Sequence, residues 1–234
     1  MCVSINGTFF SGEHLWPRSY GLIDHPSLTD LHNIRPADVN VNSSRGNKYY
    51  GECGVKSNKC LKPANKEAAS DTETDKEKWT PPLQASTACA DCYILMSHSE
   101  QTWLTWSLVV VSPPGKRNLS FFFNHVLVRG DIARALMYMA VGYGFHQPGG
   151  GPGLRLSDSP SIRNREMGLL STLLEWNEID PPSREEKLRN ERICKLYQHN
   201  RNPLLIIQNM PILYGSKLLQ ANGIVTTLPN DMDQ

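Results

Sequence analysis

The sequence predicts an α+β protein, and two observations support this fold class. Residues 1–50 alternate short apolar stretches with turn-forming residues, which is typical of short strands joined by loops. From Arg129 onward, apolar residues recur at helical spacing between start and stop signals. With 234 residues, 39% of them hydrophobic and 20% charged, the chain is long enough for one domain with a core, or for two small ones.

The first structured region is expected to contain a strand that ends near Glu13 and His14, because Pro17 follows shortly after and favours an exit from a sheet. Alternation along a strand points these two side chains to opposite sides, so both can serve one site only if the strand ends or bends there. Pro36 is expected to open a short helix, and Asn47 to lie at or just past its end.

The middle of the chain divides into two segments of different composition. Residues 51–82 are polar and are expected to form a long surface loop. Residues 83–128 carry the runs LTWSLVVV and SFFFNHVLV, which predict buried strands. Because such runs are an aggregation hazard when exposed and differ from both flanks, we interpret 83–128 as an insertion that is either disordered or an artefact of the gene model. Residues 204–234 predict an irregular tail.

The region 129–203 is expected to be mostly helical. Asp131 can cap the first helix, and Gly144 follows it as a stop signal. The apolar run MGLLSTLLEWN predicts the second helix. Ser183 and Glu186 form a Ser-x-x-Glu capping box, which predicts that a third helix begins there.

Charge and cysteine usage narrow the function classes. A net charge of +1 gives no basic field over the whole molecule, so affinity for nucleic acid has to come from a local patch. The basic segment 184–202 is one candidate, although a solvated helix face explains the same residues. Two interpretations of the six cysteines stay open: a disulfide between Cys53 and Cys60 in an exported protein, and a four-cysteine zinc site that adds Cys89 and Cys92.

No targeting or membrane segment is evident. The sequence MCVSINGTFF lacks the basic start and long apolar stretch of a secretory signal. The longest apolar region, 103–111, is well short of the roughly 20 residues that cross a bilayer. We therefore expect no membrane partner, and composition alone does not fix the compartment.

A compact set of Glu, His and Asn is chemically sufficient for hydrolysis of a phosphodiester bond. The reaction needs an attacking water, a group that takes its proton, and positive charge near the phosphate and the leaving oxygen. An imidazole can take the proton, and a hard cation such as Mg²⁺, which needs only one or two protein oxygen ligands, can supply the charge. The N-terminal region offers these residue types in GEHLWP and SSRGNKYYG.

Blocks in this region and further along the chain resemble the bacterial endonuclease I family. In order, they are EHLWPRS, TDLHNIRPADVNVNSSRGN, RGDIARALMYM, LLEWNEIDPPSREEKLRNERI and QHNRNP. The resemblance covers about residues 12–82 and 129–203. It implies a ββα-metal (His-Me) finger packed on a mainly helical C-terminal part. It also implies helical sequence upstream of Glu13, so that this chain would be a truncated form, and an extracytoplasmic location.

The resemblance implies a role for each matched residue. His14 would be the general base, and Glu13 and Asn47 would hold one Mg²⁺, for sequence-nonspecific cleavage of DNA, and also of RNA, to 5′-phosphate products. Arg45 and Arg35 are weaker candidates for a contact with the substrate phosphate. Two oxygens on one octahedral Mg²⁺, about 2.1 Å from it, lie about 3 to 4 Å apart, so Glu13 and Asn47 are expected to converge beside His14.

Structural interpretations of the same residues remain. His14, close to Trp16, could be a half-buried structural histidine, and Asn47 after Gly46 could be a turn residue. His32 is a second candidate for the base.

The residues around His32 favour a supporting role instead. Asp30, His32 and Asn33 in TDLHNI are expected to support the finger, and QHNRNP to cap and anchor the last helix. For the chain as a whole, an inactive nucleic-acid-binding or structural relic competes with the nuclease, and a zinc-binding interaction module is a third interpretation.

Overall fold

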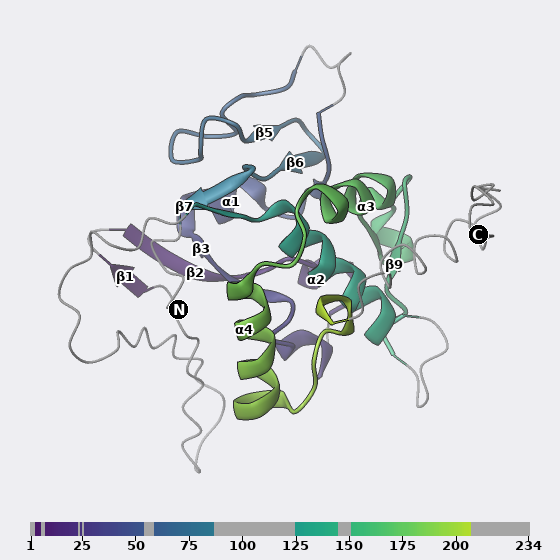
Figure 1. Cartoon of the computed structure of the whole chain (residues 1–234). Coiled ribbons are helices and arrows are strands. Elements are labelled where there is room, and N and C mark those ends of the chain that lie inside the picture. Colours follow the sequence, from purple (N-terminus) through teal and green to yellow (C-terminus); the bar gives the residue numbers. More distant parts are fainter. Residues whose placement is uncertain are drawn as a thin grey trace, which may run out of the picture.

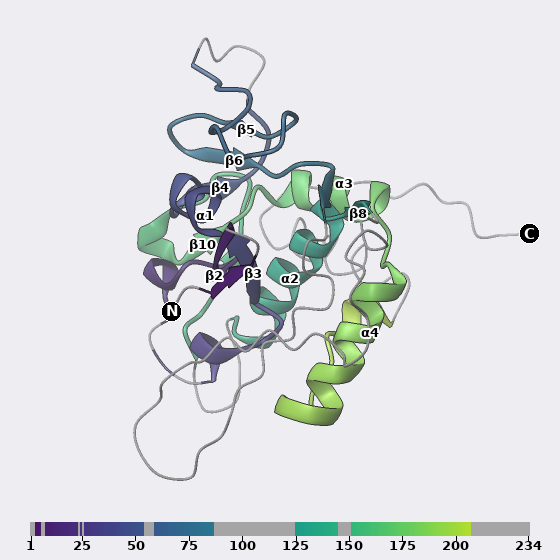
Figure 2. The same ribbon diagram turned by 90° about the vertical axis from the view of Figure 1, so that its left-hand side faces the viewer.

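The computed structural model describes residues 3–5, 8–22, 24, 26–53, 59–86, 125–144 and 151–206. Within these residues the chain has the predicted α+β fold, with small sheets and a group of helices. In Figure 2, helix α2 (Arg129–Gly142) lies between the strands β2 (Thr8–His14) and β3 (Ile34–Asp38) on one side and helix α4 (Arg184–Arg192) on the other, and Figure 1 shows the same strands to the left of α2. No helix in this described part of the chain is long and apolar enough to cross a membrane.

The first sheet carries the residues expected to be functional. Strand β2 (Thr8–His14) pairs antiparallel with β3 (Ile34–Asp38), and β1 (Val3–Ile5) pairs with the other edge of β2. Glu13 and His14 are the last two residues of β2. The expected strand end is therefore confirmed.

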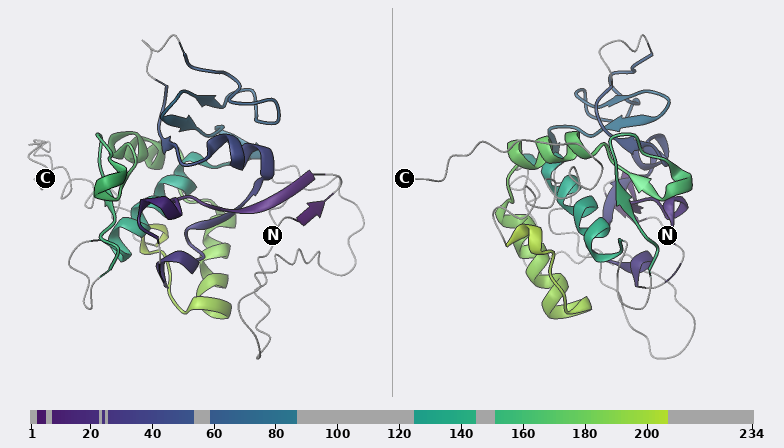
Figure 3. Two further views of the ribbon diagram at one scale, coloured as in Figure 1. Left: turned by 180° about the vertical axis from the view of Figure 1, so that it is seen from behind. Right: turned by 90° about the vertical axis from the view of Figure 1, so that its right-hand side faces the viewer.

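Helix α1 (Val39–Arg45) follows β3 directly and lies against β2 (Figure 3). Pro36, which was expected to open this helix, lies within β3, so that prediction was wrong. The helix begins instead at Asp38, whose carboxylate accepts hydrogen bonds from the backbone amides of Asn40 and Val41. A side chain that satisfies the first free amides starts a helix more effectively than a favourable φ alone.

Part of the expected surface loop forms a second sheet. Its strands β4 (Tyr49–Tyr50), β6 (Lys78–Thr80) and β5 (Glu73–Thr74) lie in the order β4-β6-β5. The prediction of a simple loop was wrong here because Trp79, only 3% exposed, supplies an apolar anchor within an otherwise polar stretch.

A disulfide joins Cys53 to Cys60, with 6.0 Å between their Cα atoms. This pairing confirms the disulfide interpretation. Cys53, Cys60 and Glu73 form the one cluster of potential metal-ligating groups found among the described residues. Because the two sulfurs are bonded to each other, they are not thiolates that could bind zinc, so the interpretation as a four-cysteine zinc site was wrong. Cys89 and Cys92 lie outside the described residues.

Strands β7 (Gln84–Ser86) and β8 (His125–Leu127) pair antiparallel, with Ser86 opposite His125. The two ends of the segment interpreted as an insertion therefore meet at adjacent positions. The run LTWSLVVV and the first part of SFFFNHVLV lie outside the described residues.

The helical part contains α2 (Arg129–Gly142), α3 (Leu170–Ile179) and α4 (Arg184–Arg192), which continues as a π-helical segment (Ile193–Gln198). The remaining short elements are the parallel strands β9 (Arg155–Leu156) and β10 (Glu166–Met167) and the 3₁₀ turns η1 (Arg18–Tyr20), η2 (Ser27–Thr29), η4 (Ile162–Asn164) and η6 (Pro203–Leu205).

The starts of these helices test two capping predictions. Helix α2 is preceded by Val128 and not by Asp131, whose carboxylate binds Arg35, so the predicted cap was wrong. At α4, the Ser183 hydroxyl accepts a hydrogen bond from the amide of Glu186 at 3.0 Å, which confirms this cap. The Glu186 carboxylate turns away from the cap and accepts hydrogen bonds from the Arg134 guanidinium, at 2.9 and 2.6 Å.

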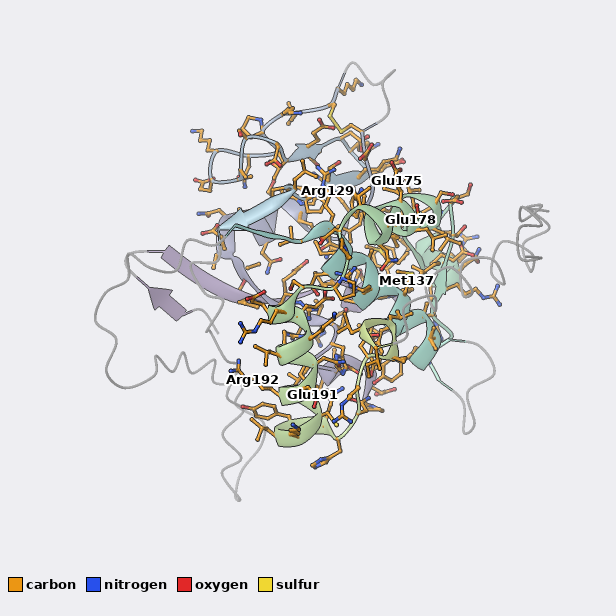
Figure 4. All side chains as sticks on the ribbon, in the orientation of Figure 1. Arg129, Met137, Glu175, Glu178, Glu191 and Arg192 are labelled. Atoms are coloured by element: carbon orange, nitrogen blue, oxygen red, sulfur yellow. A yellow bond between two sulfur atoms is a disulfide. The ribbon has the colours of Figure 1, made fainter. Side chains whose placement is uncertain are left out.

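The core is built around α2. Every residue of 133–140 is buried, because the helix is covered on all sides. Met137 lies near the middle of the molecule (Figure 4), and Trp16 and Trp176 are both 0% exposed. Helix α2 thus forms one continuous core with the residues that follow β2, with Tyr50 and Trp79 of the second sheet, and with helix α3.

Candidate active site

Arg45 fastens the end of β2 to the end of α1. Its guanidinium donates from Nη1 to the Glu13 carboxylate at 2.5 Å and to the His14 carbonyl at 3.1 Å, and from Nη2 to the Leu15 carbonyl at 2.7 Å. Arg45 is 3% exposed and also lies over the Tyr50 ring, 4.4 Å from its centroid. Because one buried side chain makes all these contacts, the position of Glu13 relative to α1 is fixed.

The environment of Glu13 balances two effects. Burial raises the pKa of this carboxyl, and the positive charge of Arg45 offsets part of that rise. Only one carboxylate oxygen, Oε1, receives the Arg45 hydrogen bond, and no other donor among the described residues bonds to Glu13. The second oxygen is thus free to act as a ligand.

The His14 ring is held in one tautomer. Its Nε2 atom lies 2.9 Å from the carbonyl oxygen of Leu28. A carbonyl only accepts hydrogen bonds, so Nε2 carries the proton and Nδ1 of the neutral ring carries the free lone pair. Burial lowers the pKa of His14, and so does the charge of Arg18, against the opposing effect of the hydrogen bond to Leu28, so the neutral form is favoured.

Asn47 lies just past the end of α1, as expected. Gly46, with φ 57°, ends the helix, and the Asn47 carbonyl accepts a hydrogen bond from the Tyr20 hydroxyl at 2.5 Å. Asn47 itself is exposed. The backbone at this position is therefore anchored while the residue remains accessible, and the convergence of its amide oxygen with Glu13 stays a prediction.

The donor set fits a hard divalent cation. A carboxylate oxygen of Glu13 is free of protein donors among the described residues, and the amide of Asn47 is accessible. Oxygen donors of these types suit Mg²⁺, which is satisfied by few protein ligands because it keeps several waters.

Asp30 links the N-terminal part of the chain to the helical part. Its carboxylate accepts hydrogen bonds from the hydroxyls of Tyr138 and Tyr143, at 2.8 and 2.6 Å, and from Gln198 Nε2 at 3.0 Å. These partners belong to α2, its C-terminal end and the π-helical segment. Asp30 therefore joins the finger to the helical part, as expected of a structural residue.

His32 and Asn33 are also structural. His32 is 2% exposed, and its ring centroid lies 4.6 Å from that of Tyr138. Asn33 is 0% exposed and binds Trp16 twice, accepting from its amide at 2.7 Å and donating to its carbonyl at 3.2 Å. A substrate cannot reach a histidine that is so deeply buried, so the prediction of His32 as an alternative base was wrong.

QHNRNP anchors the chain after α4, as expected. Asn202 is 3% exposed and accepts from Leu204 N at 3.0 Å and donates to the Arg134 carbonyl at 3.1 Å. Asn200 donates to the Tyr138 hydroxyl at 2.8 Å.

The arginines proposed as phosphate ligands have other partners. Arg35 binds the Asp131 carboxylate, with distances of 3.3 and 2.6 Å, and its Nη1 donates to backbone carbonyls of its own turn. Arg45 is buried in the contacts described above. Both assignments stay predictions, and these contacts weigh against them, because binding phosphate would require each guanidinium to give up internal acceptors.

The basic segment 184–202 is not a uniform patch. Arg189 donates to the carbonyls of Leu31 and Ile34, at 2.5 and 2.9 Å, and is therefore structural. Arg201 and Lys195 pair with Glu191, which Figure 4 shows on α4. These contacts favour the solvated helix face over a dedicated nucleic-acid surface.

Comparison with known proteins places this chain in a family. The Endonuclease I family profile matches residues 3–112 and 124–208. An extracellular ribonuclease of Bacillus amyloliquefaciens is 34% identical over 197 residues, which are 82% of this chain and 49% of the relative. An extracellular ribonuclease of Bacillus subtilis (strain 168) is 32% identical over 197 residues, with the same coverage.

The chain therefore belongs to the Endonuclease I family. It spans about half the length of the curated relatives that it matches. The matched ranges include residues 83–112 and 124–128, so the family match extends into the segment interpreted as an insertion.

Sequence reasoning missed the residues that position the site. Tyr20 and the carbonyl of Leu28 act through contacts that no local pattern announces. The sequence indicated a role for Arg45, but it did not indicate that this side chain is buried. A usable signal was its place in the last turn of α1, beside Asn47, where a long side chain can reach back to the neighbouring strand.

Proposed function

We propose that this chain is a Mg²⁺-dependent nuclease that hydrolyses phosphodiester bonds of RNA and DNA without sequence preference. The observation that carries the proposal is the fixed His14 ring at the end of β2, next to Glu13 in the sequence, with Nε2 bound to Leu28 and Nδ1 without a hydrogen-bond partner among the described residues. Family membership supports a nucleic-acid substrate, and so do the relatives named extracellular ribonucleases.

In the proposed reaction, His14 Nδ1 takes a proton from the attacking water. Nε2 keeps its proton and its hydrogen bond to the Leu28 carbonyl, which stabilises the imidazolium that forms. The water oxygen forms a bond to phosphorus and the bond from phosphorus to the 3′ oxygen breaks. The leaving 3′ oxygen takes a proton from solvent water to become a hydroxyl, and the phosphate remains on the 5′ end of the other product.

Glu13 and Asn47 would hold the metal ion. One Mg²⁺ bound there would supply positive charge to the phosphate oxygens and the leaving oxygen. Arg45 keeps the Glu13 carboxylate aimed from the end of β2 and partly neutralises its charge. Arg45 is thus a positioning residue that does not touch the substrate.

The choice of nucleophile determines the substrate range. A water nucleophile does not require the 2′-hydroxyl, so DNA and RNA should both be cleaved, and contacts to phosphate and sugar carry no base preference. The Cys53–Cys60 disulfide and the extracellular relatives support action outside the reducing cytoplasm.

The test is cleavage of a labelled RNA and of the same sequence as DNA, with Mg²⁺ and with EDTA. We expect cleavage of both substrates only with Mg²⁺, and 5′-phosphate ends. His14→Ala should lower the rate about 100-fold or more, because a general base contributes that much. Glu13→Gln and Asn47→Ala should raise the Mg²⁺ concentration needed for half-maximal rate.

The matched control is His199→Asn. His199 is exposed and has φ 57°, a conformation that asparagine tolerates, so cleavage should be unchanged. Cleavage in EDTA, or full activity of His14→Ala, would contradict the mechanism. Binding of nucleic acid by the parent chain without cleavage would show the inactive relic instead.

A further inference from the structure

A phosphate-cleaving site needs a cation that reaches the substrate, and most cations near His14 are committed elsewhere. Arg45 and Arg35 hold Glu13 and Asp131. Lys48, next to Asn47, donates to Thr74 Oγ1 at 2.7 Å.

Arg18 differs from these residues. It is exposed, and no carboxylate of the described residues forms an ion pair with it. It opens the 3₁₀ turn η1, which follows the end of β2 after buried Leu15, Trp16 and Pro17. A phosphate could therefore bind its guanidinium without displacing an internal acceptor.

The backbone of this turn is fixed to the site. The Arg18 carbonyl accepts hydrogen bonds from Gly21 N at 3.2 Å and Leu22 N at 3.1 Å. Within the same turn, Tyr20 receives the Trp16 indole hydrogen bond at its carbonyl, 3.3 Å long, and its hydroxyl holds the Asn47 carbonyl. One rigid turn thus carries Arg18 and anchors the proposed metal ligand.

We propose that Arg18 binds the phosphate backbone of the nucleic acid as the strand passes His14 and Asn47. This inference rests on the proposed function for its substrate class. Arg18 lies just past the end of β2, and Tyr20 of the same turn donates a hydrogen bond to the Asn47 carbonyl, so the backbone that carries Arg18 is held beside both predicted site residues.

The test measures binding, so that it does not depend on cleavage. Arg18→Gln, Arg18→Lys and the control Arg184→Gln are made in the His14→Ala chain, and their affinities for a fluorescent single-stranded DNA are measured by anisotropy over a range of NaCl concentrations. Arg184 is exposed at the start of α4. Circular dichroism checks that each variant is folded.

Log K falls as log salt rises, and loss of one phosphate contact should make this slope shallower by about 0.7 for a single strand. We expect this change in Arg18→Gln, with affinity about tenfold weaker. Arg18→Lys should keep the slope, because it keeps the charge, and lose part of the affinity. Arg184→Gln should match the parent.

An unchanged slope in Arg18→Gln would overturn the proposal, and so would an equal loss of slope in Arg18→Lys. If the chain with His14 intact cleaves but Arg18→Gln keeps its slope, only this inference fails. If that chain does not cleave but the slope falls as expected, the catalytic proposal fails and the phosphate contact stands. Absence of binding by the parent would overturn both.

Discussion

At the scale of single residues, Arg45 determines where the proposed metal ligand can point. Its ion pair with Glu13 is nearly buried, with side-chain exposures of 4% and 12%. A carboxylate in such a place is costly without a partner, yet a partner bonded to both oxygens would compete with a metal ion for them. The single contact to Oε1 meets both requirements.

Arg45→Lys should therefore lower both stability and cleavage. Lysine keeps the charge but cannot donate to Glu13, His14 and Leu15 together, so we expect a loss of about 2–4 kcal/mol in the free energy of unfolding. Urea unfolding measures this loss, and cleavage should fall at least tenfold while nucleic-acid binding persists. Arg201→Lys is the control, because that arginine makes a similar double contact to Glu191 on the exposed surface. Equal losses of stability and cleavage in the two variants would contradict a special role for the Arg45 contacts.

A second residue-scale prediction concerns acid stability. Burial, and then the charges of Arg189 and Arg35, lower the pKa of His32 to about 4 from its ordinary 6.5, against the opposing effect of Asp30. As pH falls below 6.5 the unfolded chain takes up a proton before the folded protein does. Stability present above that pH is therefore lost toward pH 4, by about 3 kcal/mol at most.

His32→Gln cannot take up this proton. Urea unfolding between pH 7 and pH 4 should show a shallower loss of stability in this variant than in the parent, whatever its absolute stability. The difference between the two curves isolates His32, because other titrating groups are common to both. Parallel curves would contradict a buried neutral His32.

At the scale of elements, α2 and the end of α3 approach so closely that one glycine is required. A Cβ atom on Gly130 would lie 2.1 Å from the Asp180 carbonyl oxygen and 2.9 Å from the Asp180 Cβ. The Gly130 amide also donates to the Asp180 carboxylate at 2.7 Å. The first turn of α2 is thus pressed against the backbone that ends α3.

Gly130→Ala should destabilise the protein by about 3 kcal/mol or more, since backbone must move to admit the methyl group. Gly142→Ala is the matched control at the other end of the same helix, where nothing lies within 4 Å of the added Cβ. It should be neutral or stabilise by about 0.5–1 kcal/mol, because alanine favours the helix. Thermal unfolding compares the two variants, and a Gly130→Ala protein as stable as Gly142→Ala would exclude the close approach.

At the scale of the whole molecule, local signals in the sequence predicted the elements, and long-range partners were not predictable. The end of β2, the position of Asn47 and the Ser183 cap each depend on neighbouring residues. Arg45 pairs with Glu13 across 32 positions and Arg35 with Asp131 across 96. An arginine looks the same in a sequence whether it is buried or exposed, so phosphate contacts were assigned to two that proved internal.

The same limit applies to the segment between β7 and β8. Composition marked 83–128 as foreign, but only the pairing of its ends shows how the fold accommodates it. Because Ser86 stands opposite His125, residues 87–124 begin and end at adjacent positions of one antiparallel ladder. A two-residue turn closes such a ladder when its sequence favours type I′ geometry, as Asn-Gly does.

Replacing residues 87–124 by Asn-Gly should therefore leave a folded protein that keeps metal-dependent cleavage. The control deletion removes 84–127 and so takes away both strands. These strands lie between Pro81 and Arg129, the first residue of α2, whose side chain donates to the Pro81 carbonyl at 3.0 Å. We expect cooperative thermal unfolding near the parent temperature for the first deletion and a clear loss of stability for the second. If the first deletion abolished folding, residues 87–124 would be part of the core, and their treatment as an insertion would be wrong.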